Sequence, residues 1–331
     1  MGLKQEKVGF ILIDKRTTSM NKSSVRMKSF LSIFLMCVMG ICFISNTQAQ
    51  QDPQYTQYMF NTMSVNPAYA GSRGHAVISA LGRTQWVGFD GAPDTQNLSY
   101  DSPLGYSGLG LGINLMNDKI GPSHEVYLDA NVSYKIETGY EGNLAFGLRL
   151  GGRWLNIDWS LGKTNQEEDF PRVSKILPTI GAGLYYYEPQ WYIGLSVPNI
   201  IRTEHYDAEI PRGEVALERM HFFFITGYVF DINEDLKFKP ALLVKGVSGA
   251  PVSLDVSANL LFSEKFRVGL GWRWDDSISA LLGFQVSNSL LIGYAYDLTT
   301  SNYNVANSGT HEIMLRYEIF KEIRYRSPRF F

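Results

Sequence analysis

"KFRVGLGWRW", residues 265–274, is the stretch of sequence that decides the fold. Apolar side chains occupy every second position, and basic or glycine residues fill the positions between them. The apolar positions are Phe266, Val268, Leu270, Trp272 and Trp274. A period of two predicts a β-strand with one apolar face and one polar or small face.

The same alternation recurs along most of the chain, most clearly in GLGLGINLM (108–116), VYLDANVSYKI (126–136), LAFGLRLGGRW (144–154) and VSLDVSANLLF (252–262). With the weaker stretches included, the pattern predicts about fourteen strands, an even number as in bacterial outer-membrane barrels. Their expected spans are 75–87, 94–101, 107–117, 123–136, 142–158, 177–187, 190–197, 219–231, 236–245, 251–262, 265–274, 277–286, 289–297 and 309–319.

The start of the chain predicts export from the cytoplasm. Residues 27–49, MKSFLSIFLMCVMGICFISNTQA, have a basic start, an apolar run and a small-residue end, as in a signal peptide cleaved after Ala49. Both cysteines, Cys37 and Cys42, lie in this peptide, so the mature chain has no disulfide and no thiolate ligand. Removing residues 1–49, with seven Lys/Arg and two Asp/Glu, leaves 23 basic and 30 acidic residues, a net charge of −7. Such a charge argues against nucleic acid as a partner.

Two kinds of protein fit an exported chain of alternating strands, a closed transmembrane barrel and a large soluble β-sandwich. The lengths of the connections favour the barrel. When the connections between the predicted strands are numbered along the chain, the even-numbered connections are short. The long connections, 159–176, 198–218 and 298–308, all have odd numbers. Outer-membrane barrels have short periplasmic turns and longer external loops. The sequence therefore predicts an all-β, antiparallel outer-membrane β-barrel with periplasmic N- and C-termini, whose apolar faces contact outer-membrane lipid.

Residues 50–74, QQDPQYTQYMFNTMSVNPAYAGSRG, lack the strand period and form a separate segment between the cleaved residues 1–49 and the barrel, 75–331. Two interpretations stay open. The segment is either a plug packed in the barrel mouth or a docking element whose exposed aromatic residues bind periplasmic components or cargo. The candidate partner-binding residues are Tyr55, Tyr58, Phe60, Asn61, Asn66, Pro67 and Tyr69.

Arginines occur on the inward-facing positions of several predicted strands, and they are Arg149, Arg153, Arg267, Arg273 and Arg316. As lumen-lining residues they would either give a pore an anion preference or hold an internal plug through salt bridges. Acidic residues on the same faces favour the second use, namely Asp129, Asp255, Glu312 and Glu318.

The sequence offers no candidate for catalysis, for a metal site or for a cofactor. The five histidines, His75, His124, His205, His221 and His311, show no helical metal-ligand spacing. GLGLG (108–112) lacks the third glycine of a nucleotide-binding loop, and GLSVP (194–198) breaks the GxSxG motif of esterases. We therefore expect a protein that is not an enzyme.

Three blocks carry a resemblance to a known family. They are DPQYTQYMFNTMSVNPAYAG (52–71), RTQWVGFDGAPDTQNLSYDSPL (83–104) and LLIGYAYDL (290–298). With the signal peptide ahead of them and glycine-rich strands around them, the chain resembles the PorP/SprF family of type IX secretion system membrane proteins, over nearly all of its mature length.

The resemblance implies a Bacteroidetes-type organism and a non-enzymatic outer-membrane protein. Its expected partners are type IX secretion components and a secreted surface protein as cargo. The protein's expected role is to assist the secretion or surface attachment of that cargo, and gliding adhesins are one kind of cargo that the family serves. The alternative from another class is a porin-like outer-membrane channel for small solutes.

Overall fold

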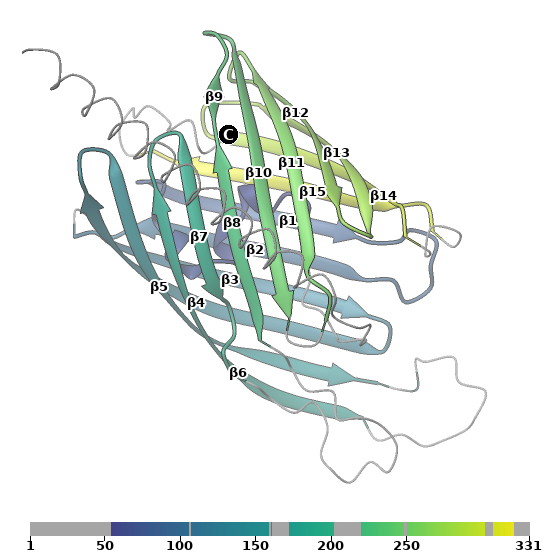
Figure 1. Cartoon of the computed structure of the whole chain (residues 1–331). Helices are drawn as coiled ribbons and strands as arrows, with labels where there is room; N and C mark the ends of the chain where they lie inside the picture. Colours follow the sequence, from purple (N-terminus) through teal and green to yellow (C-terminus); the bar gives the residue numbers. More distant parts are fainter. Residues whose placement is uncertain are drawn as a thin grey trace, which may run out of the picture. The chain divides into compact units, whose positions relative to one another are not determined.

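The computed structural model describes residues 54–105, 107–158, 160, 172–201, 220–247, 250–301 and 307–320, and the structural statements below concern these residues. They form antiparallel strands and three short 3-10 turns (Figure 1). Within these ranges, no helix has the length and apolar character needed to cross a membrane. The strands are β1 (Ala76–Thr84), β2 (Asp94–Pro103), β3 (Leu109–Ile120), β4 (Ser123–Thr138), β5 (Gly142–Ile157), β6 (Val173–Tyr187), β7 (Trp191–Val197), β8 (His221–Tyr228), β9 (Phe230–Asp231), β10 (Leu236–Val247), β11 (Ser253–Phe262), β12 (Phe266–Arg273), β13 (Ser277–Gln285), β14 (Leu290–Thr299) and β15 (Thr310–Ile319).

The strands close into a barrel. Each strand pairs with its neighbours in sequence, and the last strand, β15, pairs with the first, β1, with Ala76 opposite Ile319 and Thr84 opposite His311. β8 and β9 occupy one place in the ring because both pair with β10, so the barrel has fourteen strands. Closure leaves no edge strand, which satisfies the backbone groups in a bilayer. The predicted all-β barrel is confirmed.

One predicted strand is interrupted. The pattern predicts a single strand over 219–231, whereas the structure has β8 and β9 separated by Val229. The break lies beside Pro240 of β10, which has no N–H to donate to the ladder. Val229 instead donates its N–H to the carbonyl of Gln190 at 2.8 Å.

The two faces of β12 contact different surroundings. Phe266 and Leu270 are 57% and 67% exposed on the outside of the barrel, whereas Arg267 and Arg273 are 6% and 9% exposed on the inside. An apolar outer face with a polar interior is the pattern of a membrane barrel and the reverse of a soluble sheet core. The stretch 265–274 therefore has the predicted orientation.

The two mouths of the barrel differ in their connections. The short-turn mouth, where β1 begins and β15 ends, carries the connections 103–109, 138–142, 187–191, 231–236, 262–266 and 285–290. The opposite mouth, here the long-connection mouth, carries the connections 84–94, 120–123, 157–173, 197–221, 247–253, 273–277 and 299–310. All of the longest connections thus lie at one mouth.

Candidate functional site

The residues ahead of the barrel, 54–74, lie within the ring of strands and are called the lumen segment (Figure 1). They form three 3-10 turns, η1 (Tyr58–Phe60), η2 (Thr62–Ser64) and η3 (Pro67–Tyr69). Asn66 begins the third turn, because its side-chain oxygen accepts a hydrogen bond from the N–H of Ala68 at 3.0 Å. Pro67 suits the first position of the turn, where no N–H is needed.

The lumen segment is buried along most of its length. Every residue from Tyr55 to Ala70 is buried except Ser64, and Met63 and Ala68 are at most 1% exposed. Its apolar side chains join a cluster with inward-facing strand residues, Tyr185, Tyr187, Tyr192, Phe223, Ile225, Leu243 and Leu291 among them. The chain's own N-terminal residues therefore fill the interior where the strands surround them.

A cluster of three charged strand residues holds the start of the lumen segment, and we call it the carboxylate clamp: Arg83 of β1, Asp297 of β14 and Glu312 of β15. Glu312 accepts the backbone N–H groups of Thr56 and Gln57 at 2.9 and 2.8 Å. Arg83 lies 2.9 Å from Asp297 and 3.0 Å from Glu312. The hydroxyl of Thr56 donates to Asp297 at 2.6 Å. All three charges are at most 4% exposed, and the segment's N–H groups offset the extra negative charge.

The middle of the lumen segment is held by polar pairs. The Asn61 amide donates to the Asn97 side chain at 2.7 Å, and Asn97 donates in turn to Asn114 at 2.8 Å. On the other side, Arg149 donates to the carbonyl oxygens of Met63 and Ser64 at 2.8 and 2.9 Å. Each contact satisfies a buried polar group, which would otherwise cost free energy.

Glycines on the barrel wall allow the segment to approach the strands closely. A Cβ atom on Gly147 would overlap the backbone of Ala68, and one on Gly183 would overlap the side chain of Asn66. Asn66 uses this space to donate its amide to the carbonyl of Leu184 at 2.9 Å. The strand glycines therefore form a surface shaped for this segment.

The end of the lumen segment is held at the short-turn mouth. The carbonyl of Ala70 accepts the Ser133 hydroxyl at 2.6 Å, and the N–H of Gly71 donates to Asp101 at 2.9 Å. Arg73 forms an ion pair with Glu318 at 3.0 Å. The segment is thus fixed by charge-assisted bonds at both of its ends.

The five predicted lumen arginines all lie inside the barrel, each at most 9% exposed. Four of them face carboxylates: Arg149 with Asp129 at 3.9 Å, Arg153 with Glu125 at 3.4 Å, Arg273 with Asp255 at 2.7 Å and Arg316 with Glu318 at 3.1 Å. Arg267 and Arg316 also lie 5.5 and 5.7 Å from the ring centre of Phe60 in the lumen segment. Arg149, Arg267 and Arg316 thus contact the lumen segment directly, and the use of the arginines to hold it stays a prediction.

The seven predicted partner-binding residues are buried rather than exposed. They are Tyr55, Tyr58, Phe60, Asn61, Asn66, Pro67 and Tyr69. The reason is that the barrel interior offers their aromatic rings and amides both apolar contacts and hydrogen-bond partners, as Asn61 and Asn66 show. A partner-binding role for them stays a prediction.

Sequence reasoning missed Arg83, Asp297 and Asn97 as residues that hold the segment. The signal was present, because Arg83 and Asn97 lie in the block 83–104 and Asp297 lies in the block 290–298. Those blocks also carry the resemblance to a known family. Their shared contact with the lumen segment is visible only in the tertiary structure.

The Tyr55 hydroxyl of the lumen segment donates to the sulfur of Met116 on β3 at 2.9 Å.

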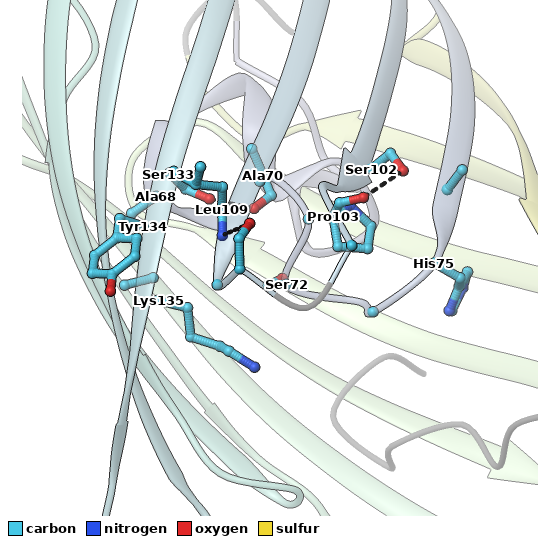
Figure 2. A pocket seen from close by; sticks show the side chains of 18 of the residues that line it. Ala68, Ala70, Ser72, His75, Ser102, Pro103, Leu109, Ser133, Tyr134 and Lys135 are labelled. Carbon is cyan, nitrogen blue, oxygen red and sulfur yellow. Dashed lines mark hydrogen bonds between the residues drawn. The ribbon is translucent and has the colours of Figure 1, made fainter.

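A cavity of 780 Å³ lies below the lumen segment at the short-turn mouth. Figure 2 shows Ala70 and Ser72 of the segment on one side of it and Tyr134 and Lys135 of β4 on another. Lys135 forms a 3.6 Å ion pair with Glu137, whose side chain is 80% exposed. This cavity is space at the short-turn mouth that the lumen segment does not fill.

Among the residues with described positions, no group of three or more His, Asp or Glu side chains is placed to hold a metal ion. The densest group of carboxylate and histidine side chains in the sequence is EHYDAE (204–209), which lies outside the described residues.

Comparison with solved structures finds other barrels at low similarity. The monoaromatic hydrocarbon channel CymD is 11% identical with a TM-score of 0.47, covering 78% of this chain and 93% of its own. A FadL homologue of Pseudomonas aeruginosa is 11% identical with a TM-score of 0.46, covering 81% and 95%. Omp33 of Acinetobacter baumannii is 7% identical with a TM-score of 0.43, covering 74% and 98%. These values carry no functional conclusion. No curated protein matches the chain.

The comparison with protein families is specific. The model for the type IX secretion system membrane protein PorP/SprF matches residues 47–317, which include the lumen segment and all strands through most of β15. The matched range includes the blocks 52–71, 83–104 and 290–298. Thr56, Arg83 and Asp297 come from these blocks, and they meet where the carboxylate clamp holds the lumen segment. The chain belongs to the PorP/SprF family of type IX secretion system membrane proteins.

Proposed function

We propose that this protein is an integral, non-enzymatic outer-membrane barrel that assists the secretion or surface attachment of a protein cargo, such as a gliding adhesin. In this proposal residues 1–49 are a cleaved leader. The short-turn mouth faces the periplasm and type IX components. The long-connection mouth faces the cell exterior, in keeping with the loop lengths of outer-membrane barrels.

One observation supports this proposal above the solute channel. The lumen segment is buried and is bonded at its start, middle and end to β1, β2, β5 and β15. A channel for small solutes needs an open path, whereas a barrel that anchors or assists a protein needs a rigid wall and specific rims. A filled lumen therefore favours the protein-handling role.

The rims are the surfaces that we propose for partner contacts. Connections 157–173 and 197–221 would contact cargo on the exterior, since binding function concentrates on loops held by a rigid scaffold. The cavity below Ala70 and Ser72 lies at the mouth proposed for the periplasmic components. In this proposal the buried aromatic residues of the lumen segment contribute to partner binding indirectly, because they shape the barrel interior next to that mouth.

The test is a mild-detergent purification of the tagged protein from native membranes, with its partners identified by mass spectrometry. We expect type IX components and one large secreted surface protein. Replacing 202–219 by a short Gly-Ser linker should remove the cargo, whereas Tyr140→Ala in the opposite turn should not. Recovery of the folded barrel alone would contradict the proposal.

A second measurement addresses the channel alternative. The purified barrel in a planar bilayer should show little steady conductance, because the lumen segment fills it. The comparison is a chain that lacks residues 50–74. The solute channel would be favoured if the intact protein conducts steadily and the shortened chain conducts no more than it does.

A further inference from the structure

We infer that the mature N-terminus is displayed at the long-connection mouth, on the cell surface, at the opposite end of the barrel from the end of β15. This differs from the arrangement that loop lengths alone predict, in which both termini are periplasmic. It rests on the orientation and the leader cleavage given under the proposed function, although it does not need the cargo role.

The first contacts of the lumen segment all lie near the long-connection mouth. The Gln54 side chain bonds to Asp255, the third residue of β11. Thr56 bonds to Asp297 and Glu312, which lie near the end of β14 and the start of β15. Those strand ends flank the connections 247–253 and 299–310.

The last contacts of the segment lie near the short-turn mouth. Ser133 and Asp101 are near the ends of β4 and β2, and they bond to Ala70 and Gly71. Arg73 then pairs with Glu318, the last residue but one of β15. Between Gln54 and Arg73 the chain therefore passes through the lumen from one mouth to the other before it enters β1.

The length of chain ahead of Gln54 prevents a return. Cleavage after Ala49 leaves residues 50–53, which can reach at most about 14 Å when fully extended. A ten-residue strand such as β15 is about 33 Å long, and the apolar band of a membrane barrel is about 25 Å tall. The mature N-terminus therefore cannot reach the short-turn mouth.

The test uses single-cysteine labelling of the full-length protein in its native outer membrane, since the mature chain contains no cysteine. A Gly-Ser-Cys-Gly-Ser insertion between Gln51 and Asp52 reports the N-terminus. Asp90→Cys, in the exposed connection 84–94, marks the long-connection mouth, and Tyr140→Cys, in the exposed turn 138–142, marks the short-turn mouth. A membrane-impermeant maleimide is applied to intact cells, to cells with a permeabilised outer membrane and to the denatured protein. Heat-modified gel mobility confirms that each variant is folded.

We expect the insertion and Asp90→Cys to react on intact cells to a similar extent, and Tyr140→Cys to react only after permeabilisation, with a change of at least tenfold. The inference is overturned when the insertion reacts together with Tyr140→Cys, or only in denaturant. Labelling of Tyr140→Cys but not Asp90→Cys on intact cells would overturn the orientation and the surface display with it. None of these results depends on whether a cargo is recovered, so failure of the cargo role is a separate outcome.

Discussion

The backbone N–H of Thr56 donates to the carboxylate of Glu312 at 2.9 Å, which joins the start of the lumen segment to the last strand of the barrel. The same carboxylate accepts Gln57 N–H and the guanidinium of Arg83. Both oxygens of Glu312 thus accept hydrogen bonds from donors, and the side chain is 1% exposed. Glu312 of β15 therefore joins Arg83 of β1 and the start of the lumen segment through one side chain.

Glu312→Gln should release the start of the lumen segment. The glutamine side chain has one oxygen and one NH2 group where the glutamate has two oxygens. In either orientation its NH2 group faces another donor, either the N–H of Gln57 or the pair formed by the N–H of Thr56 and Arg83. Loss of one member of a buried charge pair typically costs 3–5 kcal/mol. We expect faster cleavage of the segment by protease in detergent and higher conductance in a bilayer.

The matched control is Glu137→Gln, because its ion pair with Lys135 is exposed at the short-turn mouth. Exposed pairs contribute little, so this variant should behave as the wild type. Equal protection of the lumen segment in both variants would show that the clamp does not hold it.

Gly147→Ala should displace the lumen segment without changing its sequence. A methyl group at this position overlaps the backbone of Ala68, and backbone cannot move aside as a flexible side chain can. Gly152→Ala in the same strand is the control, since its Cβ has only the carbonyl of Leu177, at 3.8 Å, within contact distance. Limited proteolysis should cut the segment several times faster in Gly147→Ala than in Gly152→Ala. Identical digestion patterns would contradict the close contact.

Asn66→Asp should destabilise the protein more than Asn66→Ala. Alanine loses the turn cap at Ala68 and the bond to Leu184, and loss of a cap costs about 1 kcal/mol. Aspartate keeps the cap but places a buried negative oxygen against the Leu184 carbonyl, where the amide now donates at 2.9 Å. Urea unfolding from lipid vesicles measures both, and an aspartate variant as stable as the alanine variant would refute the amide's role as donor.

Leu270→Arg should destabilise the barrel by about 2–4 kcal/mol, the cost of arginine on a lipid face at the bilayer midplane. Leu270 is 67% exposed on the outer face and lies in the middle of β12. Phe266→Arg, on the same face at the end of the strand, should cost about 0–1 kcal/mol because it is close to the interface. Similar unfolding free energies for the two variants would mean that this face does not cross the bilayer centre.

Much of the fold follows from local pattern. Each predicted strand is present within about four residues at either end, with β8 and β9 together lying within the predicted span 219–231. This success has a physical cause, since a strand with lipid on one side and a polar lumen on the other shows its period in every stretch. The largest shift is at β6, which begins at Val173 rather than 177, where Ser174, Lys175 and Pro178 obscure the alternation.

The interior was less predictable because its partners are far apart in the chain. Thr56 and Glu312 are separated by 256 positions, and Asn61 and Asn97 by 36. The polar residues at these positions look the same in sequence whether they face water or another side chain. For the same reason the aromatic residues of the lumen segment read equally well as an exposed interface or as a packed plug.

The sequence by itself determined the class of the protein: alternating strands, the sorting of short and long connections, and the blocks shared with a secretion family. Those features depend on period and spacing, which are local properties of the chain. Only the tertiary structure decided that residues 54–74 fill the lumen, that Arg83, Asp297 and Glu312 hold their start, and that the segment passes from one mouth to the other. These depend on which distant groups meet in a closed barrel, where each buried polar group must find a partner.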